Sequence, residues 1–146
     1  MKNLFVLIFI LLFPVSLMAN TLDEERKEWV LSNLMDDMLS CSVYYFIGGD
    51  ALQKANQETH SQFYAVSKEL MDRSKAIAFE INMKELVVET KWKQHLKSQT
   101  DIIENNYKNL SLLSDMFDDT CPHWVSNSFQ DRINHWAYEW SKRFED

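Results

Sequence analysis

Carboxylates and an imidazole, the side chains that most often bind metals or transfer protons, gather in the stretch "DMFDDTCPHW". Asp115, Asp118, Asp119 and His123 fall within nine residues there. Such oxygen and nitrogen ligands suit a divalent cation, but their spacing matches neither a calcium-binding loop nor a zinc motif. These four residues are the candidates for a metal site. We expect no metal, because Asp119 or Thr120 can instead cap the helix that follows.

A second group of this kind consists of Asp131, His135 and Glu139, which are spaced by four residues and therefore share one face of a helix. A histidine between two carboxylates could bind a metal or act as a base with a raised pKa. The same spacing also forms the salt-bridge ladder of a solvated helix face. We favour the ladder, because His135 lies off the apolar stripe. His60 and His95 have no evident partner in the sequence.

The stretch "CSVYYFIGGDAL" places Tyr44 and Tyr45 beside Gly48 and Gly49, the only two glycines of the chain. Glycines on a helix face could open a slot for a ligand ring or for a partner helix. They also let two helix backbones approach closely inside a bundle. We favour packing and keep these four residues as candidate contacts of a partner or ligand.

Tryptophans supply the other candidate contacts. Trp92 lies in "KWKQHLK", a basic cluster that could dock on an acidic partner or on lipid headgroups. The cluster also has an explanation that needs no partner. Trp92 fits the apolar stripe of its helix, and lysines are favoured near a helix C-terminus by the helix dipole. Trp124 is a further candidate together with Trp29, Trp136 and Trp140, because tryptophan is enriched at binding hot spots.

Motifs of the common enzyme classes are missing from the sequence. It contains no G-x-S-x-G, no H-E-x-x-H, no phosphate-binding glycine loop and no C-x-x-C. A chain whose only glycines are adjacent has little means to build the tight, strained loops of most active sites. We therefore expect neither catalytic residues nor a cofactor.

Few residues that break helices are available to separate the elements. After residue 19 these are Gly48, Gly49 and Pro122, so long helices are favoured over strands. The apolar spacing predicts an all-α, antiparallel bundle of three to four long helices within a single domain, residues 20–146. We expect helices at about 22–56, 60–98, 100–119 and 122–145, with room for a kink near Asn82 in the second.

The glycine pair is the main uncertainty in the first of these helices. Asp50 and Gln53 could form a capping box that starts a new helix after the glycines. An apolar seam with steps of three and four residues instead continues through them, and a continuous helix matches the length of the next one. We therefore expect one helix. The seam consists of Leu34, Met38, Cys41, Tyr45, Gly48, Leu52 and Ala55.

The first residues have the parts of a secretory signal peptide. Lys2 is followed by an apolar run from Leu4 to Met18 and then by Ala19. The run is short for a membrane span of roughly 20 residues, and Pro14 interrupts it. We expect a signal peptide over residues 1–19 and a secreted or bacterial periplasmic protein. An uncleaved anchor is the alternative, and only then do we expect membrane contact.

The net charge bears on the class of partner, and the cysteine count bears on the covalent structure. A formal net charge of -7 argues against nucleic acid, because phosphate binding needs clustered positive charge. Cys41 and Cys121 are the only cysteines, and an oxidising compartment favours a disulfide between them.

These observations together favour a helical protein that acts by binding. Another protein is the expected partner, as for an inhibitor, an immunity protein or a chaperone-like protein. The alternative is a carrier of a small ligand or a metal that uses the interior of the bundle.

Overall fold

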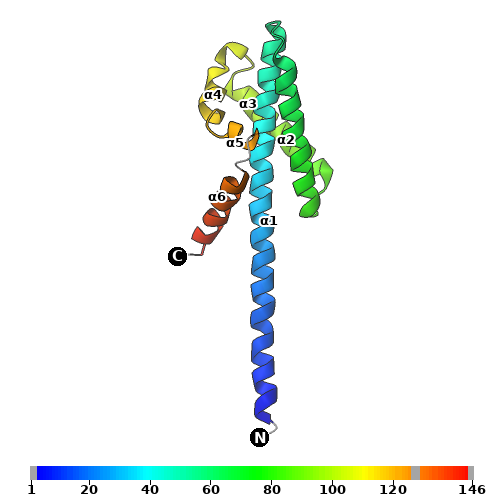
Figure 1. The fold of residues 1–146 in the computed structure, drawn as a ribbon, viewed down its shortest axis with the longest axis vertical. Coiled ribbons are helices and arrows are strands. Elements are labelled where there is room, and N and C mark those ends of the chain that lie inside the picture. Colours follow the sequence, from blue (N-terminus) through cyan, green and yellow to red (C-terminus); the bar gives the residue numbers. More distant parts are fainter. Residues whose placement is uncertain (1–2, 126–128, 145–146) are drawn as a thin grey trace.

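The computed structural model describes the backbone of residues 3–125 and 129–144, and the side chains of residues 23–124 and 130–144. Every regular element in these ranges is helical (Figure 1), which confirms the prediction of an all-α protein. The elements are α1 (Asn3–Lys54), α2 (His60–Glu80), α3 (Glu85–Ile102), the 3₁₀ helix η1 (Tyr107–Asn109), α4 (Ser111–Phe117), α5 (Cys121–Val125) and α6 (Phe129–Lys142).

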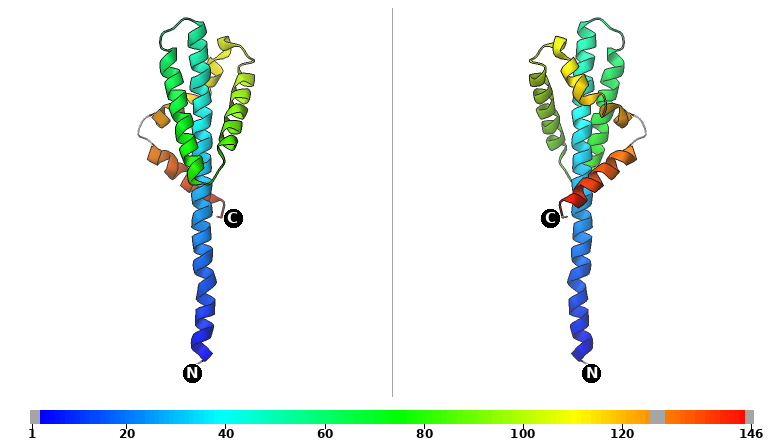
Figure 2. Two further views of the ribbon diagram at one scale, coloured as in Figure 1. Left: turned by 90° about the vertical axis from the view of Figure 1, so that its right-hand side faces the viewer. Right: turned by 90° about the vertical axis from the view of Figure 1, so that its left-hand side faces the viewer.

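The first helix is the axis around which the others pack. α2 returns antiparallel to α1, and the chain reverses again before α3, which runs in the same direction as α1 (Figures 1 and 2). α4 and α5 lie along another side of α1, and α6 crosses α1 closer to the N-terminus. Three long helices are thus packed together, as the predicted bundle requires.

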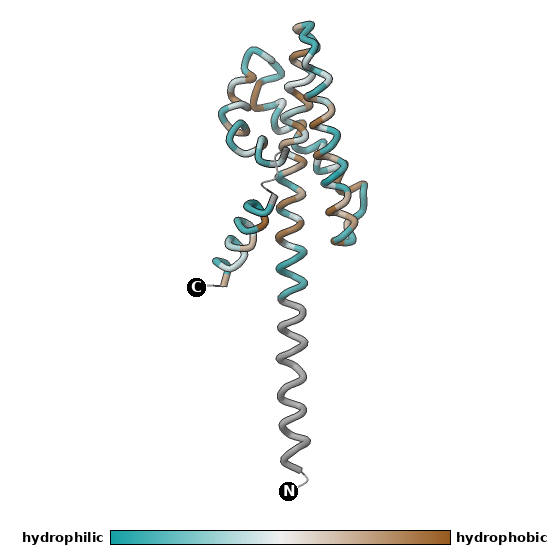
Figure 3. Tube along the Cα trace, in the orientation of Figure 1, coloured by the Kyte–Doolittle hydropathy of each residue, from teal (hydrophilic) through white to brown (hydrophobic). Residues whose placement is uncertain are grey.

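Buried side chains project from several sides of α1 between residues 30 and 47. One cluster joins α1 to α2 and α5, a second joins it to α2 and α3, and a third joins it to α3 and α4. Figure 3 shows hydrophobic residues recurring along this part of α1. Burial of each large apolar side chain contributes roughly 2 kcal/mol, so this stretch is a major source of stability. The α1 residues are Val30, Leu34, Met38 and Cys41 in the first cluster, Met35 and Leu39 in the second, and Val43 and Ile47 in the third.

The glycine pair lies inside α1, as the apolar seam predicts. α1 continues through Gly48 and Gly49 to Lys54, and neither glycine has a positive φ. Residues in the left-handed conformation instead follow α1, α2 and α3, namely Asn56, Asn82 and Glu104, each with φ of 54°. A short polar side chain such as that of asparagine tolerates this conformation better than most others do.

Asn82 divides the predicted second helix. The expectation of one helix over 60–98 is wrong, because α2 ends at Glu80 and α3 begins only at Glu85. The amide of Asn82 donates to the Phe79 carbonyl (3.2 Å) and that of Met83 to the Ala78 carbonyl (2.8 Å), which is the Schellman pattern that ends helices. The kink allowed near Asn82 is therefore a complete reversal of the chain.

The predicted helix over 100–119 is also wrong. α3 continues to Ile102, where Glu104 and Asn105 both have positive φ and turn the chain. Asn106 then starts η1 by accepting a hydrogen bond from the Lys108 amide (3.1 Å), and α4 spans only seven residues. Glu104 and two asparagines, which favour turns, thus replace the first turns of the expected helix.

The last predicted helix, 122–145, is two helices. α5 contains five residues and α6 contains fourteen, and residues 126–128 between them lie outside the described chain. The disulfide between Cys41 and Cys121 is confirmed, with a Cα–Cα distance of 5.4 Å. It links α1 to the start of α5 across a sequence separation of 80 residues. Among residues with described side chains, no helix has the length and apolarity that crossing a membrane requires.

Candidate functional site

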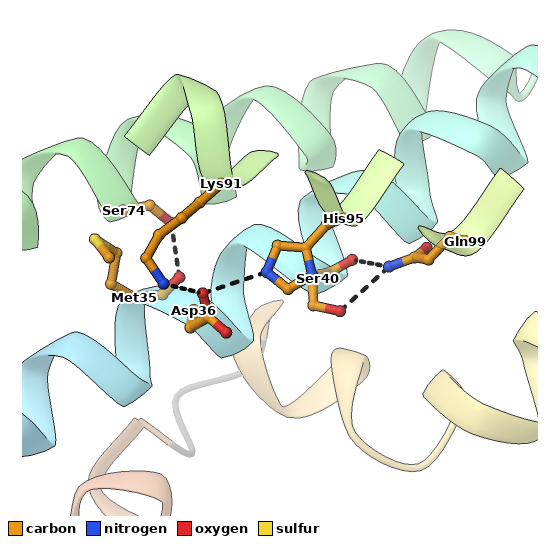
Figure 4. A network of polar contacts seen from close by, with 7 residues as sticks. All are labelled: Met35, Asp36, Ser40, Ser74, Lys91, His95 and Gln99. Carbon is orange, nitrogen blue, oxygen red and sulfur yellow. Dashed lines mark hydrogen bonds and ion pairs between the residues drawn. The ribbon is translucent and has the colours of Figure 1, made fainter. Parts of the chain in front are cut away.

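Ionisable side chains meet along the contact between α1 and α3. The Lys91 ammonium lies 2.8 Å from Asp36 Oδ1, and Nε2 of His95 lies 3.3 Å from the same oxygen. Figure 4 shows both side chains pointing from α3 toward Asp36. The hydrogen bond from His95 lowers the pKa of Asp36 from 3.8 to about 2, with a further contribution from Lys91, although partial burial opposes the shift.

One turn further along, Gln99 joins the same two helices. Its amide nitrogen donates to the Ser40 carbonyl (2.8 Å) and lies 3.2 Å from Ser40 Oγ (Figure 4). Asp36 and Ser40 are four residues apart on α1, as His95 and Gln99 are on α3, so parallel helices bring the pairs into register. We call Asp36, Ser40, Lys91, His95 and Gln99 the α1–α3 polar seam.

The polar seam contains the residue types of a catalytic triad without the geometry of one. A triad needs a hydrogen bond from the hydroxyl to the imidazole, so that the histidine can remove the proton. Among the described residues, Ser40 Oγ contacts Gln99, and no hydrogen bond joins it to His95. The arrangement can hold α3 in register on α1, and it does not activate a nucleophile.

Asp37, the next residue of α1, holds α6. Its Oδ2 forms an ion pair with Arg132 and accepts a hydrogen bond of 2.9 Å from Trp136 Nε1. The Arg132 guanidinium carbon also lies 5.8 Å from the ring centroids of both Trp124 and Trp136. Trp29 of α1 packs edge-on against Trp136, with the ring centroids 5.6 Å apart. Charge and aromatic packing therefore fix α6 on α1.

The glycine pair makes room for aromatic rings of α2. A methyl group built on Gly48 would lie 2.9 Å from Cδ1 of Phe63, and one built on Gly49 would lie 2.9 Å from Cε1 of Tyr64. Real carbon atoms essentially never approach so closely, so only glycine fits unless the rings move. The two glycines thus face packed rings of the bundle, where a ligand ring or partner helix would have to displace them.

The tyrosines next to the glycines are also engaged within the bundle. The Tyr44 hydroxyl donates to Asp118 Oδ1 over 2.6 Å and lies 3.4 Å from Ser114 Oγ, which ties α1 to α4. Burial and the hydrogen bond to Asp118 raise the pKa of Tyr44 to about 12. Burial also raises the pKa of Tyr45. Both hydroxyls therefore stay protonated at neutral pH.

Two candidate contact residues are structural. Trp92 donates from Nε1 to Ser42 Oγ (3.1 Å), and the Ser42 hydroxyl in turn donates to the Ser67 carbonyl (2.8 Å), so α1, α2 and α3 meet at one serine. Trp124 is only 1% exposed and belongs to the core around the disulfide. Its position therefore does not support the expectation that Trp124 contacts a partner.

Two members of each group singled out for metal binding line one shallow pocket, and its lining does not include Asp115, Asp118 or Glu139. Asp119 and His123 line it from one side, and Asp131 and His135 line it from α6, around a volume of about 300 Å³. Within the described residues, however, no three His, Cys, Asp or Glu side chains are placed to hold a metal ion. On α6, Glu139 forms an ion pair at 2.8 Å with Lys142, a residue outside the expected ladder of Asp131, His135 and Glu139.

A further polar group that the sequence did not reveal lies at the far end of α1. The Lys54 ammonium is 3.1 Å from Asp50 Oδ2 and 3.0 Å from the Tyr107 hydroxyl, which also donates to Asp50. The hydrogen bond from Tyr107 lowers the pKa of Asp50. A pocket of about 250 Å³ adjoins this group, and its apolar lining includes Phe46 and Leu96.

Most of these contacts connect residues that are far apart in the sequence. Asp36 and His95 are separated by 59 positions, which is why His95 showed no partner in the sequence. Only the apolar spacing around Asp36 and Asp37 signalled that this part of α1 is enclosed by other helices. Comparison with models of protein families, with curated proteins and with solved structures found no match to this chain.

Proposed function

We propose that the chain is an extracytoplasmic, non-catalytic protein that binds another protein through the exposed face of α4. The observation that carries this proposal is a pair of large apolar side chains on that face. Leu112 is 47% exposed and Met116 is 54% exposed, and at a spacing of four residues they point the same way. Exposed apolar side chains that lie together and are rimmed by polar groups can mark a protein-interaction site.

The charges around this pair indicate the chemistry of the partner. Asp115 and Asp119 are both exposed, one in the last turn of α4 and one just after it. Carboxylates at the C-terminal end of a helix are unfavourable, because the helix dipole is negative there. Lysine or arginine side chains of a partner would relieve this repulsion. The expected partner is therefore a basic, amphipathic segment of another protein.

The features of a signal peptide and the disulfide support a location outside the cytoplasm. The expected classes are an inhibitor, an immunity protein or a chaperone-like protein of the cell envelope. The net charge of -7 agrees with a basic partner and disfavours nucleic acid.

Site-specific photocrosslinking tests the proposal. A photoreactive amino acid placed at position 112 or 116 in the native host is expected to give one discrete crosslinked protein. The matched control carries the same amino acid at Ser98, an exposed position of α3. The partner must contain a basic, amphipathic segment at the crosslinked site. Equal crosslinking from all three positions, or none from 112 and 116, would contradict the proposal.

Transport of a small ligand is the second candidate, supported by the pocket beside Asp50, Lys54 and Tyr107. Its apolar lining and polar edge could take a small amphipathic molecule, although about 250 Å³ is at the lower limit for such sites. Native mass spectrometry of protein purified from its host tests this function. A bound mass that is lost in Tyr107→Ala would favour the carrier, and a bare chain would rule against it.

A further inference from the structure

One end of the bundle carries several exposed large apolar side chains. At the turn between α2 and α3, Phe79 is 84% exposed and Leu86 is 70% exposed, and Phe144 just after α6 is 61% exposed. Figures 1 and 3 show that this turn and the end of α6 both point toward the N-terminus of the chain. The opposite end, the α1–α2 turn at residues 53–59, has no large apolar side chain.

Contacts with α1 fix how far these side chains lie from the N-terminal segment. Glu80 forms an ion pair with Lys27 at 3.8 Å, so the end of α2 lies beside that residue. Asp23 and Arg26 line a pocket together with Phe144, which places the end of α6 at the same level. Two separate parts of the chain thus present aromatic rings next to residues 23–27 of α1.

The apolar run of the sequence ends close to this level. Met18 is the last residue of the run, and Lys27 lies nine positions further along the helix, a rise of about 14 Å. The headgroup layer of a bilayer is roughly 5–8 Å thick on each side, so the level of Lys27 lies a few ångströms outside it when the run fills the hydrocarbon. A run shorter than the hydrocarbon thickness also draws its flanking residues toward the bilayer.

We propose that, in the full chain, this end of the bundle rests on the lipid bilayer that the N-terminal segment enters. Phe79 and Phe144 then lie in the headgroup layer, where aromatic side chains are favoured. This inference concerns the chain that retains residues 1–19, and it does not depend on the partner proposed for α4.

Cell-free synthesis of the 146-residue chain with phosphatidylcholine nanodiscs tests the proposal, because no signal peptidase is present to remove the segment. An environment-sensitive fluorescent amino acid replaces Phe79, or Phe144 in a second sample. The controls carry it at Leu112, which is exposed but lies on α4, and at Gln57, which lies in the polar turn. The measurement is quenching of the label by brominated phosphatidylcholine, with oxidised Cys41–Cys121 verified by mass.

The proposal expects strong quenching at positions 79 and 144 and none at 57 and 112. Equal quenching at 79 and 112, or no quenching at 79 and 144, would overturn it. A second measurement is the mass of the protein found in the membrane fraction of its host, which tests the same proposal. A membrane-bound chain of full mass supports the proposal, whereas a chain that lacks residues 1–19 would show that the segment does not hold it there.

Discussion

Asp36 and Asp37 are adjacent in α1, yet their carboxylates hold two different helices. Asp36 binds Lys91 and His95 of α3. Asp37 binds Arg132 and Trp136 of α6. Successive residues of a helix point about 100° apart, so one pair of acids can serve elements on two sides of α1. The packing of the bundle around α1 therefore depends on charges as well as on apolar contacts.

Substitution of Asp36 by asparagine should change how stability depends on pH. The folded-state pKa of about 2 lies below the ordinary value of 3.8, so the stabilisation is present above pH 3.8 and is lost as pH falls toward 2. Because the side chain is 42% exposed, we expect a loss of only about 1 kcal/mol at pH 7. Urea unfolding at pH 7 and at pH 2 measures it.

The matched control for this prediction is Asp72→Asn, which removes an exposed pair with Lys68 on α2. It should change stability by a few tenths of a kcal/mol at most. Equal losses in the two variants at pH 7, or a loss in Asp36→Asn that persists at pH 2, would show that the contacts of Asp36 do not stabilise the fold in this way.

Arg132→Ala, which breaks the ion pair between Asp37 and Arg132, should release α6 from α1. Both side chains are 23% exposed, and removing one partner leaves the other charge partly buried, at a cost of about 1–3 kcal/mol. Arg132→Lys should restore little, because an ammonium cannot reproduce the planar contacts with Trp124 and Trp136. Limited proteolysis at Lys142 and Arg143 reports the release. Resistance equal to that of the unchanged protein would disprove it.

Gly48→Ala should destabilise the protein only while Phe63 is present. The added methyl group gains about 1 kcal/mol of helix propensity but clashes with the ring, and overpacking typically costs about 1–3 kcal/mol. In the Phe63→Ala background the same change should become neutral or stabilising. A double-mutant cycle of unfolding free energies measures this coupling. Destabilisation of the same size in both backgrounds would mean that the ring contact is not the cause.

Glu104→Gly should stabilise the protein by about 1 kcal/mol. Glu104 has φ of 54°, a conformation that costs roughly 1–2 kcal/mol for a residue with a Cβ atom and nothing for glycine. The control is Glu58→Gly, since Glu58 lacks a positive φ and should gain nothing. Thermal unfolding of the two variants provides the comparison. A lower melting temperature for Glu104→Gly would contradict the strain at this position.

The sequence was sufficient for the helical class, for the continuity of α1 and for the disulfide. These follow from local quantities, namely apolar spacing around Leu34 and Met38 and a count of two cysteines. The ends of α2 and α3 were missed because Asn82 and Glu104 end helices as glycine usually does. An asparagine just after an apolar helix turn, as at Asn56 and Asn82, was the available signal.

The candidate site was less accessible to sequence reasoning. The α1–α3 polar seam and the contacts of Asp37 with Arg132 and Trp136 join residues that are 55 to 99 positions apart. No local spacing in the sequence therefore reveals them. Tyr44 was noticed for its neighbours, but its hydrogen bond to Asp118 depends on where α4 packs. Contacts of this kind are fixed only when the whole bundle has formed.

The account depends most on the claim that α4 binds a basic partner. Its most direct test is co-purification from the native host of the unchanged protein and of Asp115→Lys/Asp119→Lys. The control Glu24→Lys/Glu25→Lys makes the same change of net charge at exposed positions of α1. We predict that the partner is retained by the unchanged protein and by the control, and lost with the α4 variant. Retention of the same partner by the α4 variant would contradict the account.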